Sequence, residues 1–141
     1  MPARSRSLLL VDTSVAVALT VADHEHHEAT ITAVGGHRLG LAGHAAFETF
    51  SVLTRLPTPA RRSPATVAGL LATAFPATRF LGAQAAASLL RGLGDAVIAG
   101  GAVYDALVGA CAAEHGLALA TRDRRALETY RALDVRVDLL T

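Results

Sequence analysis

Apolar residues in this chain form short continuous runs separated by longer segments of helical character. The first run, Leu8–Val11, has four residues and ends at Asp12, which is typical of a strand buried on both faces. Four more short runs predict further strands. The predicted strands are Leu8–Val11, 38–42, 78–81, 117–120 and 135–137.

The segments between these runs carry signals for helix starts. Ser63 followed by Pro64 places a serine at the cap and a proline at the first helical position. Thr13 or Ser14 is expected to cap the first helix, and Asp23 the second. The predicted helices are 13–21, 24–34, 44–56, 64–75, 83–93, Ala102–His115 and 123–133.

Strands that alternate with helices predict a parallel α/β sheet. We therefore expect an α/β fold with a single domain over residues 1–141, built on a central parallel sheet of four or five short strands flanked by helices. The length of 141 residues and the 52% hydrophobic content are enough for one domain with its own core.

Net charge and cysteine content exclude several classes of protein. The formal charge of +1 argues against a strongly basic nucleic-acid binder, although only as an average over the chain. The chain has no lysine, so it cannot carry a phosphate-binding loop that ends in lysine. Cys111 is the single cysteine, which excludes an intramolecular disulfide and a cysteine zinc site and favours a cytoplasmic location.

The N-terminal segment 1–22 superficially resembles a signal peptide, with Arg4 and Arg6 ahead of an apolar stretch. Asp12 lies inside that stretch, where an acid costs ~2.5–3.5 kcal/mol at the centre of a membrane-inserted helix. A second apolar stretch, 93–113, is interrupted by acids and glycines. We expect no membrane-spanning segment and no membrane partner.

Four acids stand at apolar boundaries. Asp12 follows LLLV, Glu48 lies within AAFETFSVL, Asp105 opens YDALVGACAA, and Asp123 comes two residues after LALA. Ligands of open parallel sheets bind beyond the carboxyl ends of the strands, and unpaired acids there need a counter-cation. Mg²⁺ or Mn²⁺ accepts a few carboxylates, waters and phosphates, and lowers the pKa of its bound water. The pattern indicates hydrolysis of a phosphodiester.

Taken in order, the motifs VDTSV, AAFETFSVLTRL, VYDALVGACAAEHG and LALATRDRR resemble the PIN-domain family, most closely the VapC-type toxins of bacterial toxin–antitoxin pairs. The resemblance spans essentially the whole chain and implies a metal-dependent ribonuclease that inhibits translation and growth. Ser14 and Thr121 match polar positions beside the site of that family. The resemblance also implies a homodimer and a VapB-type antitoxin that occludes the site, often with an arginine. The acids that it assigns to catalysis and to binding of Mg²⁺ or Mn²⁺ are Asp12, Glu48, Asp105 and Asp123.

Each acid also has an ordinary structural explanation. The two acids that follow strands could cap the next helix. Asp105 could be favoured in the first turn of its helix by the helix dipole. Glu48 could pair with His44 or Arg55. The corresponding alternative function is a catalytically inactive PIN-like module that binds RNA or an antitoxin.

Arginines near the acids are candidates for holding an RNA backbone. Arg122, Arg124 and Arg125 cluster after the fourth predicted strand, and Arg61 with Arg62 forms a second pair. Guanidinium groups suit phosphate oxygens, but the same pattern is typical of a solvated helix start.

Aromatic and histidine side chains suggest less. Tyr104 could stack on a base, although core packing explains it better, and with two Tyr and four Phe an aromatic RNA platform is not expected. His24 and His27 share a helix face that could bind a metal, but the acidic residues around them favour a solvated surface.

Overall fold

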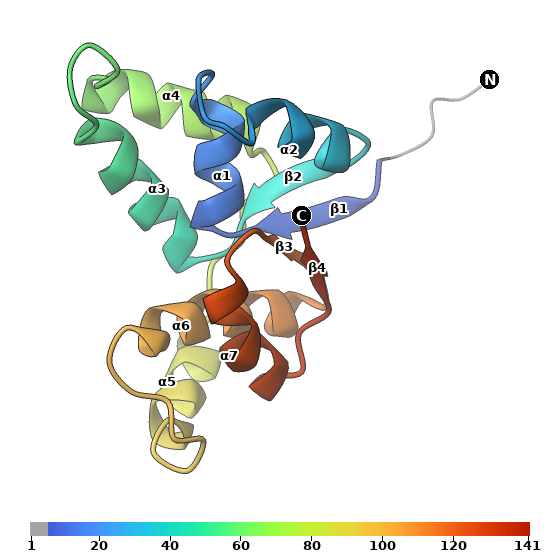
Figure 1. The fold of residues 1–141 in the computed structure, drawn as a ribbon. Helices are drawn as coiled ribbons and strands as arrows, with labels where there is room; N and C mark the ends of the chain where they lie inside the picture. The colour runs from blue at the N-terminus through green and yellow to red at the C-terminus, as the bar shows by residue number, and fades with distance from the viewer. Residues whose placement is uncertain (1–5) are drawn as a thin grey trace.

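The computed structural model describes residues 6–141 and shows helices on both faces of a small sheet (Figure 1). Arg4 lies outside the described residues. The strands are β1 (Leu8–Val11), β2 (Arg38–Leu41), β3 (Leu119–Thr121) and β4 (Val137–Leu139). The helices are α1 (Thr13–Thr20), α2 (His27–Val34), α3 (His44–Thr54), α4 (Pro64–Ala74), α5 (Ala83–Gly92), α6 (Ala102–His115) and α7 (Leu127–Ala132), with one 3₁₀ turn, η1 (Arg124–Ala126).

All strand pairs are parallel, and the order across the sheet is β2-β1-β3-β4. Val11, the last residue of β1, pairs with Leu41 of β2 and with Ala120 of β3. The carboxyl ends of these three strands therefore meet at one edge of the sheet. The predicted α/β class with a parallel sheet is confirmed.

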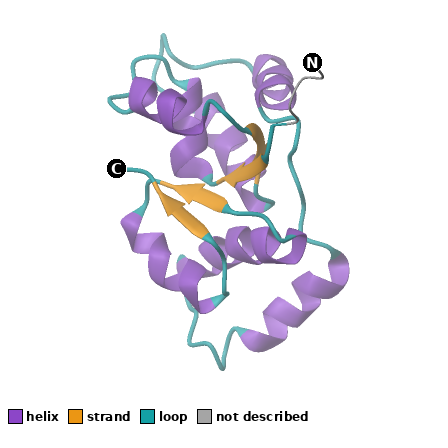
Figure 2. Ribbon diagram, turned by 90° about the vertical axis from the view of Figure 1, so that its right-hand side faces the viewer, coloured by secondary structure: helices purple, strands orange, loops and turns teal. Residues whose placement is uncertain are grey.

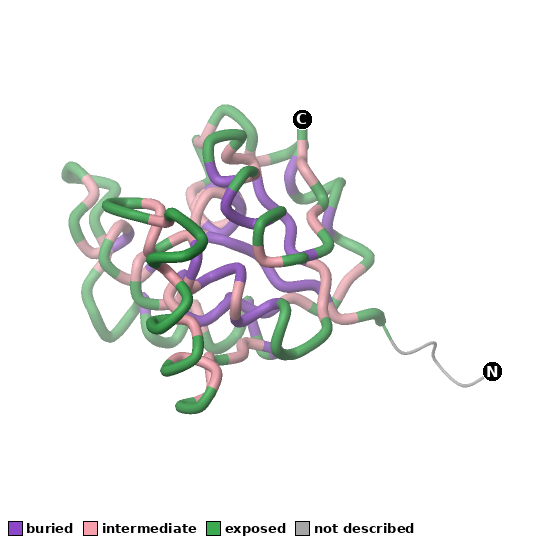
Figure 3. Tube along the Cα trace, turned by 90° about the horizontal axis from the view of Figure 1, so that it is seen from below, coloured by how far each residue is buried: buried purple, intermediate pink, exposed green. Residues whose placement is uncertain are grey.

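Alternation along β1 divides the interior into two cores. Leu9 and Val11 face the core under α1 and α2, whereas Leu10 faces the core under α6 and α7. Figure 2 shows the strands between the two groups of helices, and Figure 3 shows the buried backbone running through the middle of the molecule. Leu8–Val11 is apolar throughout because each side of β1 meets helices.

The strand predicted at 78–81 does not form a ladder. One isolated bridge pairs Arg79 with Ala42 at the edge of β2. The hydroxyl of Thr78 accepts the N–H of Leu41 at 3.0 Å, so a side chain takes the place that a strand carbonyl would fill. The described sheet consequently has four strands, the lower of the two predicted numbers.

The second helix begins later than predicted. Its cap is His26 rather than Asp23, and no side-chain hydrogen bond closes it. Nδ1 of His24 accepts the N–H of His26 at 3.0 Å, which holds this segment in a turn. His27 places its Nδ1 2.8 Å from the carbonyl oxygen of Ala18, so this ring contacts α1.

Two C-terminal strands are displaced from their predicted positions. The N–H of Leu117 bonds to the carbonyl of Ala112 at 3.1 Å, which extends the end of α6 and delays β3. Val135 donates to the carbonyl of Tyr130 at 3.3 Å, so the chain leaves α7 only after this residue and β4 starts at Val137. Apolar runs locate strands well but do not reveal such helix-end bonds.

The signal-like apolar stretch near the N-terminus is part of the folded core. It forms β1 and α1, whose residues Leu10, Val11 and Val15 are completely buried. None of the helices within residues 6–141 combines the length and the apolar character needed to cross a membrane.

Candidate active site at the carboxyl edge of the sheet

Asp12 is the centre of a buried polar cluster directly after β1. It is only 4% exposed and accepts the N–H of Val15 at 3.3 Å, so it caps α1 in place of Thr13 or Ser14. Burial raises the pKa of the Asp12 carboxyl, and the hydrogen bonds that it accepts oppose this rise. The structural explanation of Asp12 as a cap is therefore correct, but it accounts for only one of its bonds.

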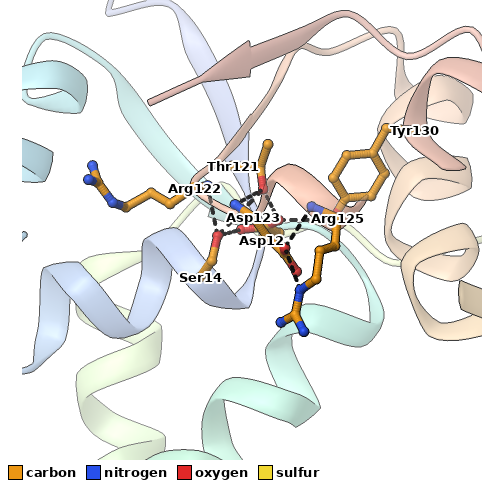
Figure 4. Close-up of polar contacts among 7 residues, drawn as sticks. All are labelled: Asp12, Ser14, Thr121, Arg122, Asp123, Arg125 and Tyr130. Atoms are coloured by element: carbon orange, nitrogen blue, oxygen red, sulfur yellow. Dashed lines mark hydrogen bonds and ion pairs between the residues drawn. The ribbon is translucent and has the colours of Figure 1, made fainter. Parts of the chain in front are cut away.

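Three hydroxyl groups orient the Asp12 carboxylate (Figure 4). Ser14 donates to Oδ1 at 2.5 Å. Thr121 donates to Oδ2 at 2.5 Å, and Tyr130 donates to the same oxygen at 2.9 Å. Asp12, which directly follows β1, is thus fixed by residues from α1, β3 and α7, which are far apart in the sequence.

Two of these hydroxyls also tie the ends of the strands together. Ser14 accepts the N–H of Arg122 at 2.8 Å, and Thr121 accepts the N–H of Asp123 at 3.0 Å. The chain leaving β3 is therefore bound to the start of α1 by side chains. This explains why polar residues lie at Ser14 and Thr121, next to apolar strands.

Tyr130 is the member of the cluster that sequence reasoning missed. It is almost fully buried in the core between α6 and α7, with its hydroxyl on Asp12. Burial, followed by the negative charge of Asp12, raises the pKa of this hydroxyl, so it remains a proton donor to the carboxylate. A single tyrosine in an amphipathic segment gives no functional signal until its burial is known.

Glu48 is held at the same edge by α3. Gly43 precedes this helix with a φ of 53°, a left-handed conformation that favours glycine, and it lies close to Cys111 of α6. Oε1 of Glu48 lies 3.1 Å from Nε2 of His44, and Oε2 accepts the hydroxyl of Thr13 at 3.2 Å. The alternative pairing with His44 is therefore present.

Asp105 occupies the first turn of α6, and no side-chain hydrogen bond to it occurs within residues 6–141. Burial raises the pKa of its carboxyl to about 6, and the charges of Asp123, Glu48 and Asp12 add to that rise in this order. Arg125 acts in the opposite direction. All four predicted acids therefore share one electrostatic field.

Asp123 has an evident structural role. It precedes η1 and accepts the N–H of Arg125 at 3.0 Å, with the Nε of the same arginine at 3.4 Å. The arginine side chain is 94% exposed, so this ion pair is weak. The cap explanation is correct for Asp123 as well, and its charge still acts on Asp105.

The donor chemistry of these acids suits Mg²⁺ or Mn²⁺, which prefer carboxylate oxygens. The four carboxylates are not preassembled around a cation, because within residues 6–141 no three Asp, Glu, His or Cys side chains form a ready ligand group. Asp12 already receives four hydrogen bonds, about the number of acceptor sites on a carboxylate. A cation bound at these acids would relieve the repulsion that the Asp105 carboxylate experiences.

A cavity of about 400 Å³ lies between α3 and α6, next to two of the four acids. Glu48 and Asp105 contribute to its wall, together with Arg55 and Tyr104. Tyr104 is 52% exposed, so the expectation that it packs in the core is wrong. Its ring stacks on His44, with centroids 5.1 Å apart and an interplanar angle of 21°.

The predicted arginine cluster is divided between different partners. Arg122 turns away from the acids in Figure 4 and donates to the hydroxyl of Thr30 on α2 at 3.3 Å. Arg61 and Arg62 each donate to a backbone carbonyl of a neighbouring segment. Arg124 is exposed. Of the predicted phosphate contacts, the exposed arginines after β3 are therefore the most available.

The structure is that of an α/β protein with an acidic site at the carboxyl edge of a four-stranded parallel sheet. Comparison with known proteins gives the family. The family model of the PIN domain matches residues 9–132, and the chain belongs to this family. It is 47% identical over 129 residues to Ribonuclease VapC27 of Mycobacterium tuberculosis (strain ATCC 25618 / H37Rv), covering 92% of this chain and 94% of that protein.

A second relative is Ribonuclease VapC40 of Mycobacterium tuberculosis (strain CDC 1551 / Oshkosh), 45% identical over 138 residues, with 95% and 100% of the two chains covered. Among solved structures, FitAB bound to IR36 DNA fragment gives a TM-score of 0.66 at 17% identity over 93% of this chain and 94% of that chain. FitAcB from Neisseria gonorrhoeae gives 0.63 at 17%, with 92% and 95% covered. These two structures support the fold.

Proposed function

We propose that this chain is a Mg²⁺- or Mn²⁺-dependent endoribonuclease that acts in the cytoplasm as the toxin of a VapBC-type pair. The observation that carries the proposal is the position of four acids at one edge of the sheet, where the charges of Asp123, Glu48 and Asp12 add to the rise that burial produces in the pKa of Asp105. The similarity to proteins named ribonuclease VapC27 and VapC40 supports the same reaction.

Asp12, Glu48, Asp105 and Asp123 are the residues that would hold the cation. When bound, the cation supplies charge neutralisation and an activated water for attack on a phosphodiester. The hydroxyls of Ser14, Thr121 and Tyr130 keep Asp12 oriented. Thr13 and His44 do the same for Glu48.

RNA and an antitoxin are the partners that we propose. The exposed arginines Arg124 and Arg125 would bind phosphates and offset the repulsion between RNA and the acids. A VapB-type antitoxin would block the same acids, and an arginine of that partner would suit the charge of Asp105.

We propose a homodimer that covers the exposed phenylalanines between α3 and α5. Phe47 is 65% and Phe80 is 55% exposed, and their ring centroids lie 6.0 Å apart. Exposed apolar patches of this kind mark protein interfaces. Sedimentation of Phe47→Glu should show a monomer where the unmodified chain is a dimer.

The nuclease proposal is tested by incubating purified chain with single-stranded RNA in Mg²⁺, in Mn²⁺ and in EDTA. Cleavage should require the cation, and sequencing of the new 5′ ends should identify the RNA and the cleaved bond. Cleavage that continues in EDTA would contradict the proposal.

The alternative function is a catalytically inactive module that binds RNA or an antitoxin. The absence of a preassembled ligand group among the described residues is the observation that favours it. Calorimetric titration with Mn²⁺ separates the two functions, because the nuclease needs a saturable cation site and the module does not.

A further inference from the structure

The cavity between α3 and α6 is lined by the acids Glu48 and Asp105 and by the aromatic ring of Tyr104. Its volume of about 400 Å³ lies within the ~300–1,000 Å³ range of ligand pockets. We propose that it is a subsite for an unpaired nucleobase of the RNA substrate, in which Tyr104 is the stacking residue. This proposal rests on the nuclease function above and adds the residue on which an unpaired base of the substrate stacks.

Tyr104 presents an aromatic ring in the first turn of α6. More than half of the residue is exposed, and its ring lies 5.1 Å from that of His44 at 21°, within the geometry of stacked aromatics. The ring is therefore held in one orientation while much of its surface remains open. A nucleobase can extend this stack by a third ring, and such stacking tolerates any base.

The stack is tied to the acidic site. Glu48 lies 3.1 Å from Nε2 of His44 and accepts the hydroxyl of Thr13 from α1. Tyr104 immediately precedes Asp105 in the chain. A base on Tyr104 would therefore bring its own phosphate near the acids, which is the placement that cleavage of the adjoining bond requires.

Arg55 lines the same cavity and makes no ion pair within residues 6–141. Its guanidinium gives an otherwise acidic cavity a group that attracts phosphate. Bases within an RNA duplex are stacked on one another, so a stacking subsite selects single-stranded RNA or an unpaired loop.

The test uses the full chain carrying Asp12→Asn to suppress cleavage, with a short single-stranded RNA in which 2-aminopurine replaces one base at a time. Stacking on the protein should quench the fluorescence of 2-aminopurine at one position. Tyr104→Ala should remove that quenching and weaken binding about tenfold, whereas Tyr104→Phe should keep both. Leu90→Ala, an exposed apolar change on α5, is the matched control that should change neither.

Unchanged quenching and affinity in Tyr104→Ala overturn the base subsite. A shift from dimer to monomer in Tyr104→Ala with quenching preserved also overturns it, and assigns the ring to a protein contact. Failure of the nuclease function is read separately, from the unmodified chain and Mn²⁺, because the fluorescence signal does not depend on cleavage.

Discussion

Asp12 and Asp105 lie at the same edge of the sheet but differ in the hydrogen bonds that their carboxylates accept. Asp12 is buried and accepts four hydrogen bonds, three of them from hydroxyls. Asp105 accepts no side-chain hydrogen bond within residues 6–141, and burial, followed by the charges of three other carboxylates, raises the pKa of its carboxyl. Hydrogen-bond donors hold the Asp12 carboxylate in place, whereas neighbouring carboxylates repel that of Asp105.

This difference separates two tasks within one acidic site. An acid saturated by hydrogen bonds keeps its position with or without a cation. An acid that is destabilised by its neighbours gains most when a cation arrives, because the repulsion then becomes attraction. We therefore assign Asp12 to positioning of the proposed cation and Asp105 to the response to it.

The largest expected effect is that of Asp12→Asn on RNA cleavage. An amide cannot supply the charge that the proposed cation needs, so we expect a loss of about a thousandfold, equivalent to about 4 kcal/mol of transition-state stabilisation. Initial rates in Mn²⁺ measure the effect. Asp138→Asn, on the exposed face of β4, is the matched control and should keep the full rate.

Next in size is the effect of Tyr130→Phe on cation affinity. The ring remains in the core, but one of the three hydroxyl donors to Asp12 is lost. Supporting groups of this kind are worth about 10–100-fold in metal affinity or activity. Calorimetry with Mn²⁺ measures the change, and Tyr104→Phe, which removes the only other tyrosine hydroxyl, should leave affinity unchanged. Equal Mn²⁺ affinities in the two variants would show that the Tyr130 hydroxyl does not support cation binding.

Asp105→Asn should stabilise the protein in the absence of divalent cations. The folded pKa of about 6 exceeds the ordinary 3.8, so the folded chain holds this proton more tightly than the unfolded chain. The free energy of unfolding therefore falls as pH rises through about 4 to 6. Because the carboxyl is partly exposed and screened, we expect a gain of about 1 kcal/mol for Asp105→Asn at pH 7.5.

Thermal unfolding with EDTA at pH 7.5 and at pH 4 measures this gain. It should be present at the higher pH, where the unmodified Asp105 is ionised, and nearly absent at the lower one. Mg²⁺ should stabilise the unmodified chain and narrow the difference. A variant less stable than the unmodified chain at pH 7.5 would show that Asp105 contributes a favourable interaction instead.

Much of the fold follows from local patterns in the sequence. The run Leu8–Val11 and the serine and proline at the start of α4 act within a few residues, so their positions were correctly predicted. Whether 78–81 forms a strand depends on its contact with β2, which is distant in the sequence, and there the hydroxyl of Thr78 accepts the N–H of Leu41. Local hydrophobicity carries no information about such a contact.

The site divides in the same way. Acids at strand ends could be found from the sequence because parallel strands place their carboxyl ends together. The contribution of Tyr130 could not, because its distance from Asp12 is fixed by the packing of α7 on α6. Exposure of Tyr104 was also mispredicted, since an apolar helix next to a cavity has the same sequence pattern as a buried one.

The smallest expected effect is on RNA binding, and it distinguishes Arg125, which lies near Asp105, from Arg122. Arg125 lowers the pKa of Asp105 and is almost fully exposed, whereas Arg122 is bonded to Thr30 on the far side of the cluster. Arg125→Ala should weaken single-stranded RNA binding two- to threefold, lower the slope of log K against log salt by about 0.7, and raise the pKa of Asp105 further. Arg122→Ala should leave the slope unchanged. A salt titration of RNA binding to both variants measures these slopes. A larger change in Arg122→Ala than in Arg125→Ala would show that the RNA phosphates bind on the α2 side of the site and not on the Asp105 side.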